Sequence, residues 1–195
     1  MNDKGPELDA PLPPGWLVAA WPDLMDPNFM HGVVLMCRHT DQGAFGLVLN
    51  QPLEICTDTL LTSHPIFGQV EFPVYKGGPV DAATLQYVHR VPAEIPGSQA
   101  VSDELWMGGD FEALARFVER DPERAQDDVR LFLGYSGWGA GQLEAEVGEG
   151  SWIPAPPDAG EVFHPDAEGA WRRVLSSLGD VGRGLAGQPP DPEWN

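Results

Sequence analysis

Basic residues are scarce in this chain. It contains 11 lysines and arginines against 30 aspartates and glutamates, which gives a formal net charge of −19 over 195 residues. The densest basic spacing, at Arg116, Arg120 and Arg124, is interleaved with acidic residues and is typical of a solvated helix face. Because duplex DNA is bound through a basic surface, we expect no direct binding of duplex DNA.

Cysteines and long apolar runs are also rare. The only cysteines are Cys37 and Cys56, so a disulfide framework is excluded. No second pair of ligands accompanies Cys37 and His39, so we predict no metal site. The longest apolar runs fall far short of the roughly 20 residues that span a bilayer, and no signal peptide is visible. We therefore expect a cytoplasmic protein without membrane association.

The segment 130–152 is rich in glycine but lacks the complete motifs in which glycine binds phosphate. Gln142 stands where a dinucleotide fingerprint of Gly137 and Gly139 would need its third glycine, and no P-loop Lys-Ser/Thr pair follows. The serine nucleophile motif is also incomplete, because its second glycine comes one place early. The pattern favours a structural turn that holds Trp138 against backbone, and a pocket for an unknown ligand stays open. We predict no bound cofactor.

The remaining pattern predicts one α+β domain at residues 16–178. An apolar fraction of 42% and seven tryptophans suffice for a core. Residues 1–15 and 179–195 are rich in Pro, Gly and acidic residues, so we expect flexible tails. Strands outnumber helices without regular alternation, which favours a mixed sheet. We expect a helical turn at 26–32, strands at 15–22, 33–39, 45–50, 72–80, 84–91 and 129–135, and helices at 57–64, 110–122, 141–150 and 166–179.

Two side chains on the first predicted hairpin suggest reactivity. Cys37 and His39 are two positions apart on a strand, so we expect them on one face of the sheet. A thiolate beside an imidazolium would make a nucleophile or a redox sensor. The simpler alternative is that Cys37 is a small buried residue.

Polar and glycine residues gather at the ends of the predicted strands. Turn chemistry explains the glycines and an asparagine, but it does not explain a tryptophan and a glutamine at the same place. We therefore take the group as candidate binding residues: His39, Asn50, Gly77, Gly78, Gly137, Trp138, Gly139 and Gln142.

Three segments carry a resemblance to a known family. They read PDLMDPNFMHGVVLMCRHTDQGAFGLVLNQP, YKGGPV and RLFLGYSGWGAGQLEAEVGEGSW, and they resemble the YqgE/AlgH family of uncharacterised bacterial proteins. The resemblance implies a bifurcated mixed sheet that forms a pseudo-barrel flanked by helices, and it brings the label of transcriptional regulator. The matching motif positions are Asp26, Pro27, Phe29, His39, Gly43, Gly46, Asn50, Pro52, Gly77, Gly78, Pro79, Gly134, Gly137, Trp138, Gly139, Gly141, Gln142, Leu143 and Glu146.

These observations favour a non-enzymatic interaction or regulatory protein. Its net charge opposes DNA, so we expect it to act through an unknown protein partner or small ligand. The predicted recognition surface combines the hairpin, the Gly77-Gly78 turn and the segment 137–142. Two alternatives stay open, namely a small-molecule or nucleotide-binding enzyme that uses His39, Asn50 and Gln142, and a redox sensor that acts through Cys37.

Overall fold

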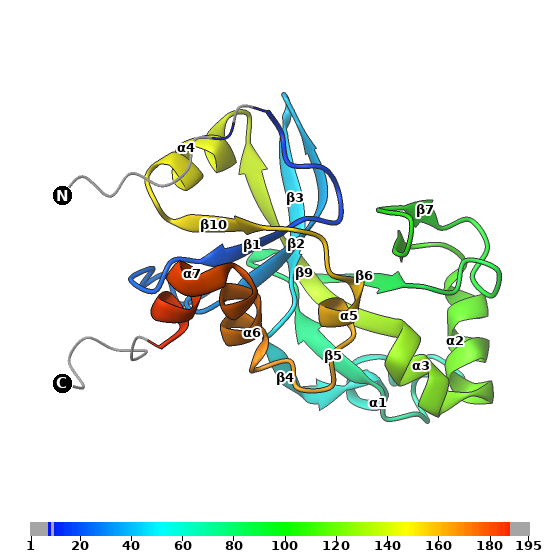
Figure 1. The fold of residues 1–195 in the computed structure, drawn as a ribbon. Helices are drawn as coiled ribbons and strands as arrows, with labels where there is room; N and C mark the ends of the chain where they lie inside the picture. Colours follow the sequence, from blue (N-terminus) through cyan, green and yellow to red (C-terminus); the bar gives the residue numbers. More distant parts are fainter. Residues whose placement is uncertain (1–7, 9, 188–195) are drawn as a thin grey trace.

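One curled sheet runs through the residues that the structure, a computed structural model, describes: residue 8 and residues 10–187 (Figure 1). In that part the strands are β1 Leu17–Ala20, β2 Val33–Thr40, β3 Gly43–Val48, β4 Pro52–Cys56, β5 Pro73–Lys76, β6 Val80–His89, β7 Gln99–Ala100, β8 Trp106–Met107, β9 Val129–Gly139 and β10 Trp152–Ala155. Their order is β10-β1-β2-β3-β9-β6-β8-β7, with β4 and β5 on a branch from β9. Among the described strands only β5 and β9 pair in parallel, so the predicted mixed sheet is confirmed.

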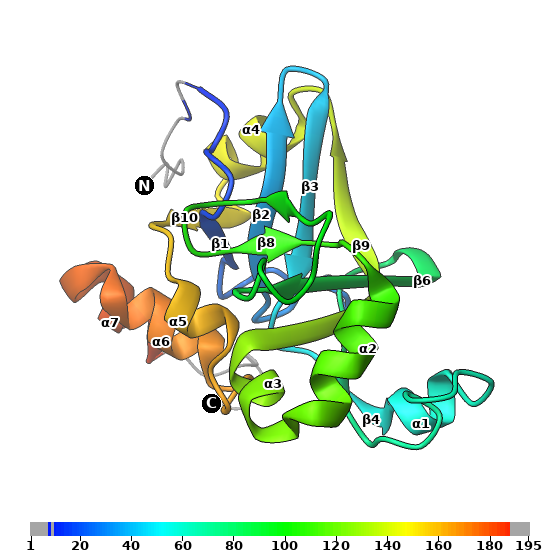
Figure 2. The same cartoon turned by 90° about the vertical axis from the view of Figure 1, so that its right-hand side faces the viewer.

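Strand β9 is where the sheet divides. Its first half pairs with β5 and β6, and its second half pairs with β3. Figure 2 shows β2, β3 and β9 side by side, with β6 crossing below them. Between the two halves lies Gly134, whose φ of +68° is a left-handed conformation that side chains disfavour. The predicted bifurcation is therefore confirmed, and it is located at a glycine.

The glycine-rich segment is strand for most of its length. We expected the strand to end at Tyr135, but β9 continues to Gly139. Gly137 and Trp138 pair with Phe45 and Ala44 of β3, so non-local hydrogen bonding keeps them extended. Local composition predicts a loop here because it does not reveal such a partner.

Short helices flank the sheet, and α2 is the clearest of those predicted. Asp110 accepts a hydrogen bond from the Ala113 amide at 2.8 Å and begins α2, as its sequence predicts. Asp121-Pro122 ends α2 and also begins α3, which was not predicted. No helix among the described residues has the length and apolar character that a membrane crossing needs. The helices are α1 Thr57–Leu60, α2 Phe111–Arg120, α3 Pro122–Asp128, α4 Gln142–Gly148, α5 Ala159–Val162, α6 Ala170–Ser177 and α7 Gly179–Ala186.

Both faces of β1, β2 and β3 are covered, which explains their continuous apolar sequences. Leu17 and Ala19 of β1 pack in a cluster with Trp171 of α6. Val18 and Ala20 point into a second cluster that contains Trp138 and residues of α4. A third cluster lies under α2 and α3, on the other side of the molecule from α6 (Figures 1 and 2).

A β-bulge at Cys37 interrupts strand β2. Met36 pairs with Gly46 and Arg38 pairs with Phe45, so Cys37 has no partner of its own in β3. Cys37 packs against the cluster under α6, whereas His39 bonds to Leu12 of the opposite cluster. The expectation that Cys37 and His39 share one face is therefore wrong, because the bulge shifts the alternation by one residue.

The segment 26–32 forms a single capped turn, as its sequence predicts: the Met30 amide donates to the Asp26 carbonyl at 2.7 Å, and the Asp26 side chain accepts from the Asn28 amide at 2.8 Å. The segments expected as flexible tails are partly ordered: Leu12 is 5% exposed within the second cluster, and 179–186 form α7. Residues 1–7, 9 and 188–195 lie outside the described residues.

The crossing of the β5–β6 turn over β9 makes a testable prediction. Gly78 has a φ of +153°, and a Cβ there would overlap the carbonyl oxygen of Tyr135. We expect Gly78→Ala to lower the free energy of unfolding by more than about 1 kcal/mol in urea denaturation. Gly148→Ala is the control, because a Cβ there meets nothing within 4 Å. Equal stability of the two variants would contradict the proposed close approach.

Candidate functional site

A single carboxylate holds two indole rings beside the second half of β9. Oε2 of Glu146, on α4, accepts from Nε1 of Trp138 at 2.9 Å and from Nε1 of Trp152 at 2.8 Å. The two indoles meet edge to face with their ring centres 5.8 Å apart. Because both tryptophans are more than nine-tenths buried, these charge-assisted hydrogen bonds satisfy donors that would otherwise be costly.

Gln142 connects this carboxylate to the end of β9. Its Nε2 donates to Oε1 of Glu146 at 2.8 Å, and its Oε1 accepts from the Gly139 amide at 2.9 Å. Gln142 and Glu146 are four positions apart, so they lie on the same face of α4. Gln142 therefore positions the helix against the strand, and Gly139 contributes through its backbone.

The indoles line an open cavity of about 400 Å³, which we call the indole pocket. Its lining includes three carboxylates and three aromatic rings but no lysine, arginine or histidine among the described residues. The third ring, Phe29, stacks on Trp138 with centroids 6.3 Å apart. The remaining walls come from Gln142, Gly137, Leu24 and Ser151. The carboxylates are Asp26, Glu146 and Glu149, and the rings are Phe29, Trp138 and Trp152.

His39 lies outside the indole pocket and has a structural environment. Its Nδ1 accepts from the Leu12 amide at 2.8 Å, so the neutral ring carries its proton on Nε2. Nε2 then donates to Oε1 of Glu144 at 3.1 Å. With the residue 7% exposed, the imidazole fastens residue 12 and α4 to β2.

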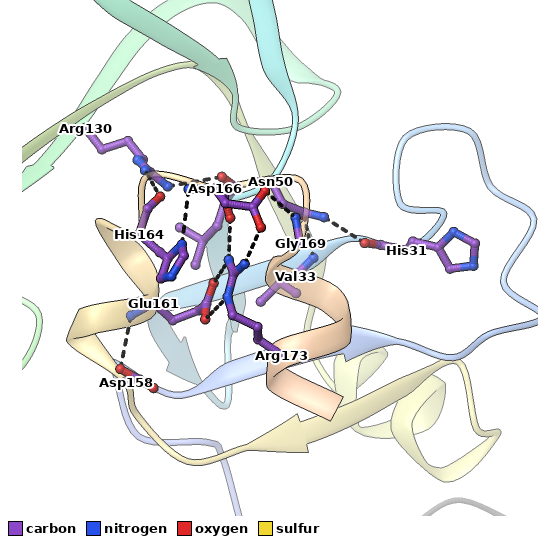
Figure 3. A network of polar contacts seen from close by, with 11 residues as sticks. His31, Val33, Asn50, Arg130, Asp158, Glu161, His164, Asp166, Gly169 and Arg173 are labelled. Atoms are coloured by element: carbon purple, nitrogen blue, oxygen red, sulfur yellow. Dashed lines mark hydrogen bonds and ion pairs between the residues drawn. The ribbon is translucent and has the colours of Figure 1, made fainter. Parts of the chain in front are cut away.

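Asn50 is likewise occupied by backbone groups. Its Oδ1 accepts from the Val33 amide at 2.9 Å, and its Nδ2 donates to the His31 carbonyl at 2.8 Å (Figure 3). Both ends of the amide bridge the loop before β2 to the end of β3. Asn50 is therefore engaged in holding a turn.

The paired glycines lie where the β5–β6 turn crosses β9. The Gly77 amide donates to the Leu133 carbonyl at 2.7 Å, and the Gly77 carbonyl accepts from the Val48 amide at 2.9 Å. The Ser136 hydroxyl also donates to the Gly77 carbonyl oxygen, at 3.1 Å. Gly77 and Gly78 are both buried.

Of the predicted binding residues, the structure brings Gly137, Trp138 and Gln142 together in the indole pocket. Gly139 adjoins the pocket, because its amide donates to Gln142.

Cys37 lines a different cavity, of about 440 Å³, together with Arg38, Phe45 and Met107. Burial raises the pKa of the Cys37 thiol to about 12, which opposes formation of a thiolate. Among the described residues, no group of three or more His, Cys, Asp or Glu side chains could hold a metal ion.

The assembled fold and site match a known family. The AlgH-like family model matches residues 17–181. The chain belongs to the AlgH-like family. A UPF0301 protein from Chlorobaculum tepidum is 38% identical over 184 residues, covering 94% of this chain and 96% of that protein. A UPF0301 protein from Chlorobium limicola is 36% identical over 184 residues, with the same shares covered.

Two solved structures share the fold of this chain. The solution structure of the AlgH protein from Pseudomonas aeruginosa matches with a TM-score of 0.69 at 26% identity, covering 94% of this chain and 98% of that one. The crystal structure of protein DIP2367 from Corynebacterium diphtheriae matches with a TM-score of 0.71 at 19% identity, covering 93% and 95%. The resemblance read from the sequence motifs is thus confirmed for both family and fold.

Seven of the ten residues that line the indole pocket were not among the predicted binding residues, namely Leu24, Asp26, Phe29, Glu146, Glu149, Ser151 and Trp152. Glu146, Phe29 and Asp26 were recognised only as motif positions, and Trp152 only as the end of a matching segment. The i,i+4 spacing of Gln142 and Glu146 after a tryptophan is the local signal that would have placed Glu146 there.

Replacing the shared carboxylate should weaken the fold measurably. In Glu146→Gln, one acceptor oxygen becomes a donor, so at least one of the three N–H groups that face Glu146 loses its acceptor. We expect the free energy of unfolding to fall by about 1–3 kcal/mol in urea denaturation. The control Glu149→Gln, at an exposed position, should stay within about 0.5 kcal/mol of the wild type. A similar loss in both variants would mean that the indole hydrogen bonds contribute little.

The raised pKa of Cys37 makes a prediction of reactivity. In a Cys56→Ser variant, iodoacetamide at neutral pH should alkylate native Cys37 about a thousandfold more slowly than the same thiol in urea, since a pKa of about 12 instead of 9.0 leaves far less thiolate. Mass spectrometry of timed samples measures both rates. Rapid alkylation of the native chain would restore the redox-sensor hypothesis.

Proposed function

We propose that this chain is a non-enzymatic interaction module whose indole pocket receives a lysine or arginine side chain of a protein partner. Any regulatory role then passes through that partner. The observation that carries the proposal is the chemistry of the pocket: aromatic rings and carboxylates, without a basic side chain in its lining.

Aromatic rings and carboxylates together suit a cation. A lysine ammonium or arginine guanidinium pairs with a carboxylate, and its apolar stem packs against aromatic rings. Asp26 and Glu149 are exposed, so they are accessible to a partner, whereas the oxygens of Glu146 already accept three N–H groups. The net charge of −19 would also accelerate the approach of a basic partner.

The loop beside the pocket offers apolar contact as well. Met25 and Met30 are 60% and 44% exposed, and they flank Asp26 and Phe29 in sequence. Methionine adapts its shape to different apolar surfaces, which suits recognition of a protein segment better than recognition of a free amine. A basic side chain with apolar neighbours is therefore the partner chemistry that fits.

The alternatives have less support. A phosphate or nucleotide in the indole pocket would face the carboxylates of Asp26 and Glu149. The enzyme hypothesis needs His39 and Asn50 to be available, but both are engaged by the groups that they hold in place. The redox hypothesis needs a thiolate at Cys37, which burial opposes.

A charge-matched pair of variants tests the proposal. Asp26→Asn/Glu149→Gln removes two carboxylates from the pocket, and the control Glu119→Gln/Glu123→Gln removes two exposed carboxylates from α2 and α3. The pocket variant should lose at least about tenfold in affinity for partners captured from a bacterial lysate, while the control should retain them.

A direct titration identifies the chemistry recognised. Nα-acetyl-lysine methylamide, which keeps the side-chain ammonium, should shift the indole N–H resonances of Trp138 and Trp152 in wild-type protein. The neutral norleucine analogue should shift them less. Equal retention of partners by both double variants, or equal shifts from both probes, would contradict the proposal.

A further inference from the structure

The side chain of Arg130, at the first half of β9, is an unusual buried cation. The residue is 4% exposed, and its guanidinium lies over the Tyr75 ring at 4.4 Å. It donates to the His164 carbonyl at 2.9 Å (Figure 3). It also donates to the Leu49 carbonyl over a longer distance of 3.5 Å. Two of its five N–H groups therefore donate hydrogen bonds, and both acceptors are uncharged carbonyl oxygens.

No carboxylate among the described residues lies within 4.0 Å of this guanidinium. The nearby buried acid, Glu161, is held at both oxygens by Arg173, at 2.7 and 3.0 Å, as Figure 3 shows. Burial lowers the pKa of Arg130, which reflects the cost of its charge. The other unpaired arginines of the described residues are exposed: Arg38, Arg116 and Arg172.

Arg130 lines a cavity of about 170 Å³ that is separate from the indole pocket. We call it the Arg130 cavity. Phe72, Tyr75 and Phe163 contribute aromatic rings to its lining, which also includes the exposed residues Gln126 and Asp127. A buried cation without an ion-pair partner, in a cavity lined by aromatic rings, provides attraction for an anion.

We infer that the Arg130 cavity binds a small monocarboxylate with an apolar or aromatic body. The planar guanidinium matches a carboxylate with two parallel hydrogen bonds, and the aromatic walls match an apolar body. The cavity is smaller than the sites of drug-sized ligands, so the ligand is small. A dianion such as phosphate fits less well, because a single guanidinium faces it and Asp127 opposes its second charge.

Titration of the full chain with three probes tests this assignment. Benzoate should bind saturably and shift the Nε–Hε resonance of Arg130 and the backbone amide of Phe163. Benzamide has the same shape without the charge, so it should bind at least about tenfold more weakly. Inorganic phosphate should not saturate. Equal affinity for benzoate and benzamide, or shifts located away from Arg130, would overturn the inference.

Two variants separate the site from the stability of the fold. Arg130→Met should reduce benzoate affinity at least about tenfold, but it removes a buried group and could unfold the chain. Asp127→Asn changes an exposed residue and should instead raise benzoate affinity roughly two- to fivefold, because it removes a repulsive charge. Glu123→Gln, on the same helix but outside the cavity lining, is the control and should have no effect.

A last probe distinguishes a free ligand from a peptide end. N-acetylphenylalanine mimics the C-terminal residue of a peptide, and its bulkier body should bind more weakly than benzoate in this small cavity. Tighter binding of N-acetylphenylalanine would assign the cavity to a peptide C-terminus and overturn the small-ligand assignment. Equal benzoate affinity of Asp127→Asn and Glu123→Gln would likewise contradict binding of benzoate in the Arg130 cavity.

Discussion

The contact between two stretches of backbone at Gly78 and Gly134 governs the rest of this fold. A Cβ on Gly134 would lie 2.6 Å from the Gly78 carbonyl oxygen, so neither position has room for a side chain. With this contact in place, β9 pairs with β5 and β6 and then turns to pair with β3. The redirected half of β9 places Trp138 beside α4, where its indole N–H donates to Glu146.

The two proposed sites have opposite charge preferences and share one strand. Trp138 lies near the end of β9 and favours an occupant with positive charge, whereas Arg130 lies near its start and favours an anion. A basic partner and a small acid would therefore not compete for the same groups. The net charge of the chain is −19, so most of its surface repels anions. The buried guanidinium of Arg130 is a local positive charge that attracts them.

Features encoded over a few neighbouring residues were predictable from the sequence. Helix α2 is one example, because Asp110 caps it and its buried residues recur at helical spacing. The bulge at Cys37 was not predictable, since it arises from the pairing of two strands. The role of Glu146 depends on an indole from β9 and another from β10, so no single segment reveals it. Recognition of family motifs supplied the bifurcated sheet, but it could not say which motif residues line a pocket.

The position of β9 in the chain has a consequence for how the protein folds as it is synthesised. β3, β5 and β6 all precede β9, yet each forms part of its hydrogen bonding with β9. Until residue 139 has left the ribosome, these strands keep open edges that could pair with other chains. Assembly of the sheet therefore has to wait until residue 139 has been made, and the nascent chain is most exposed to aggregation just before that point.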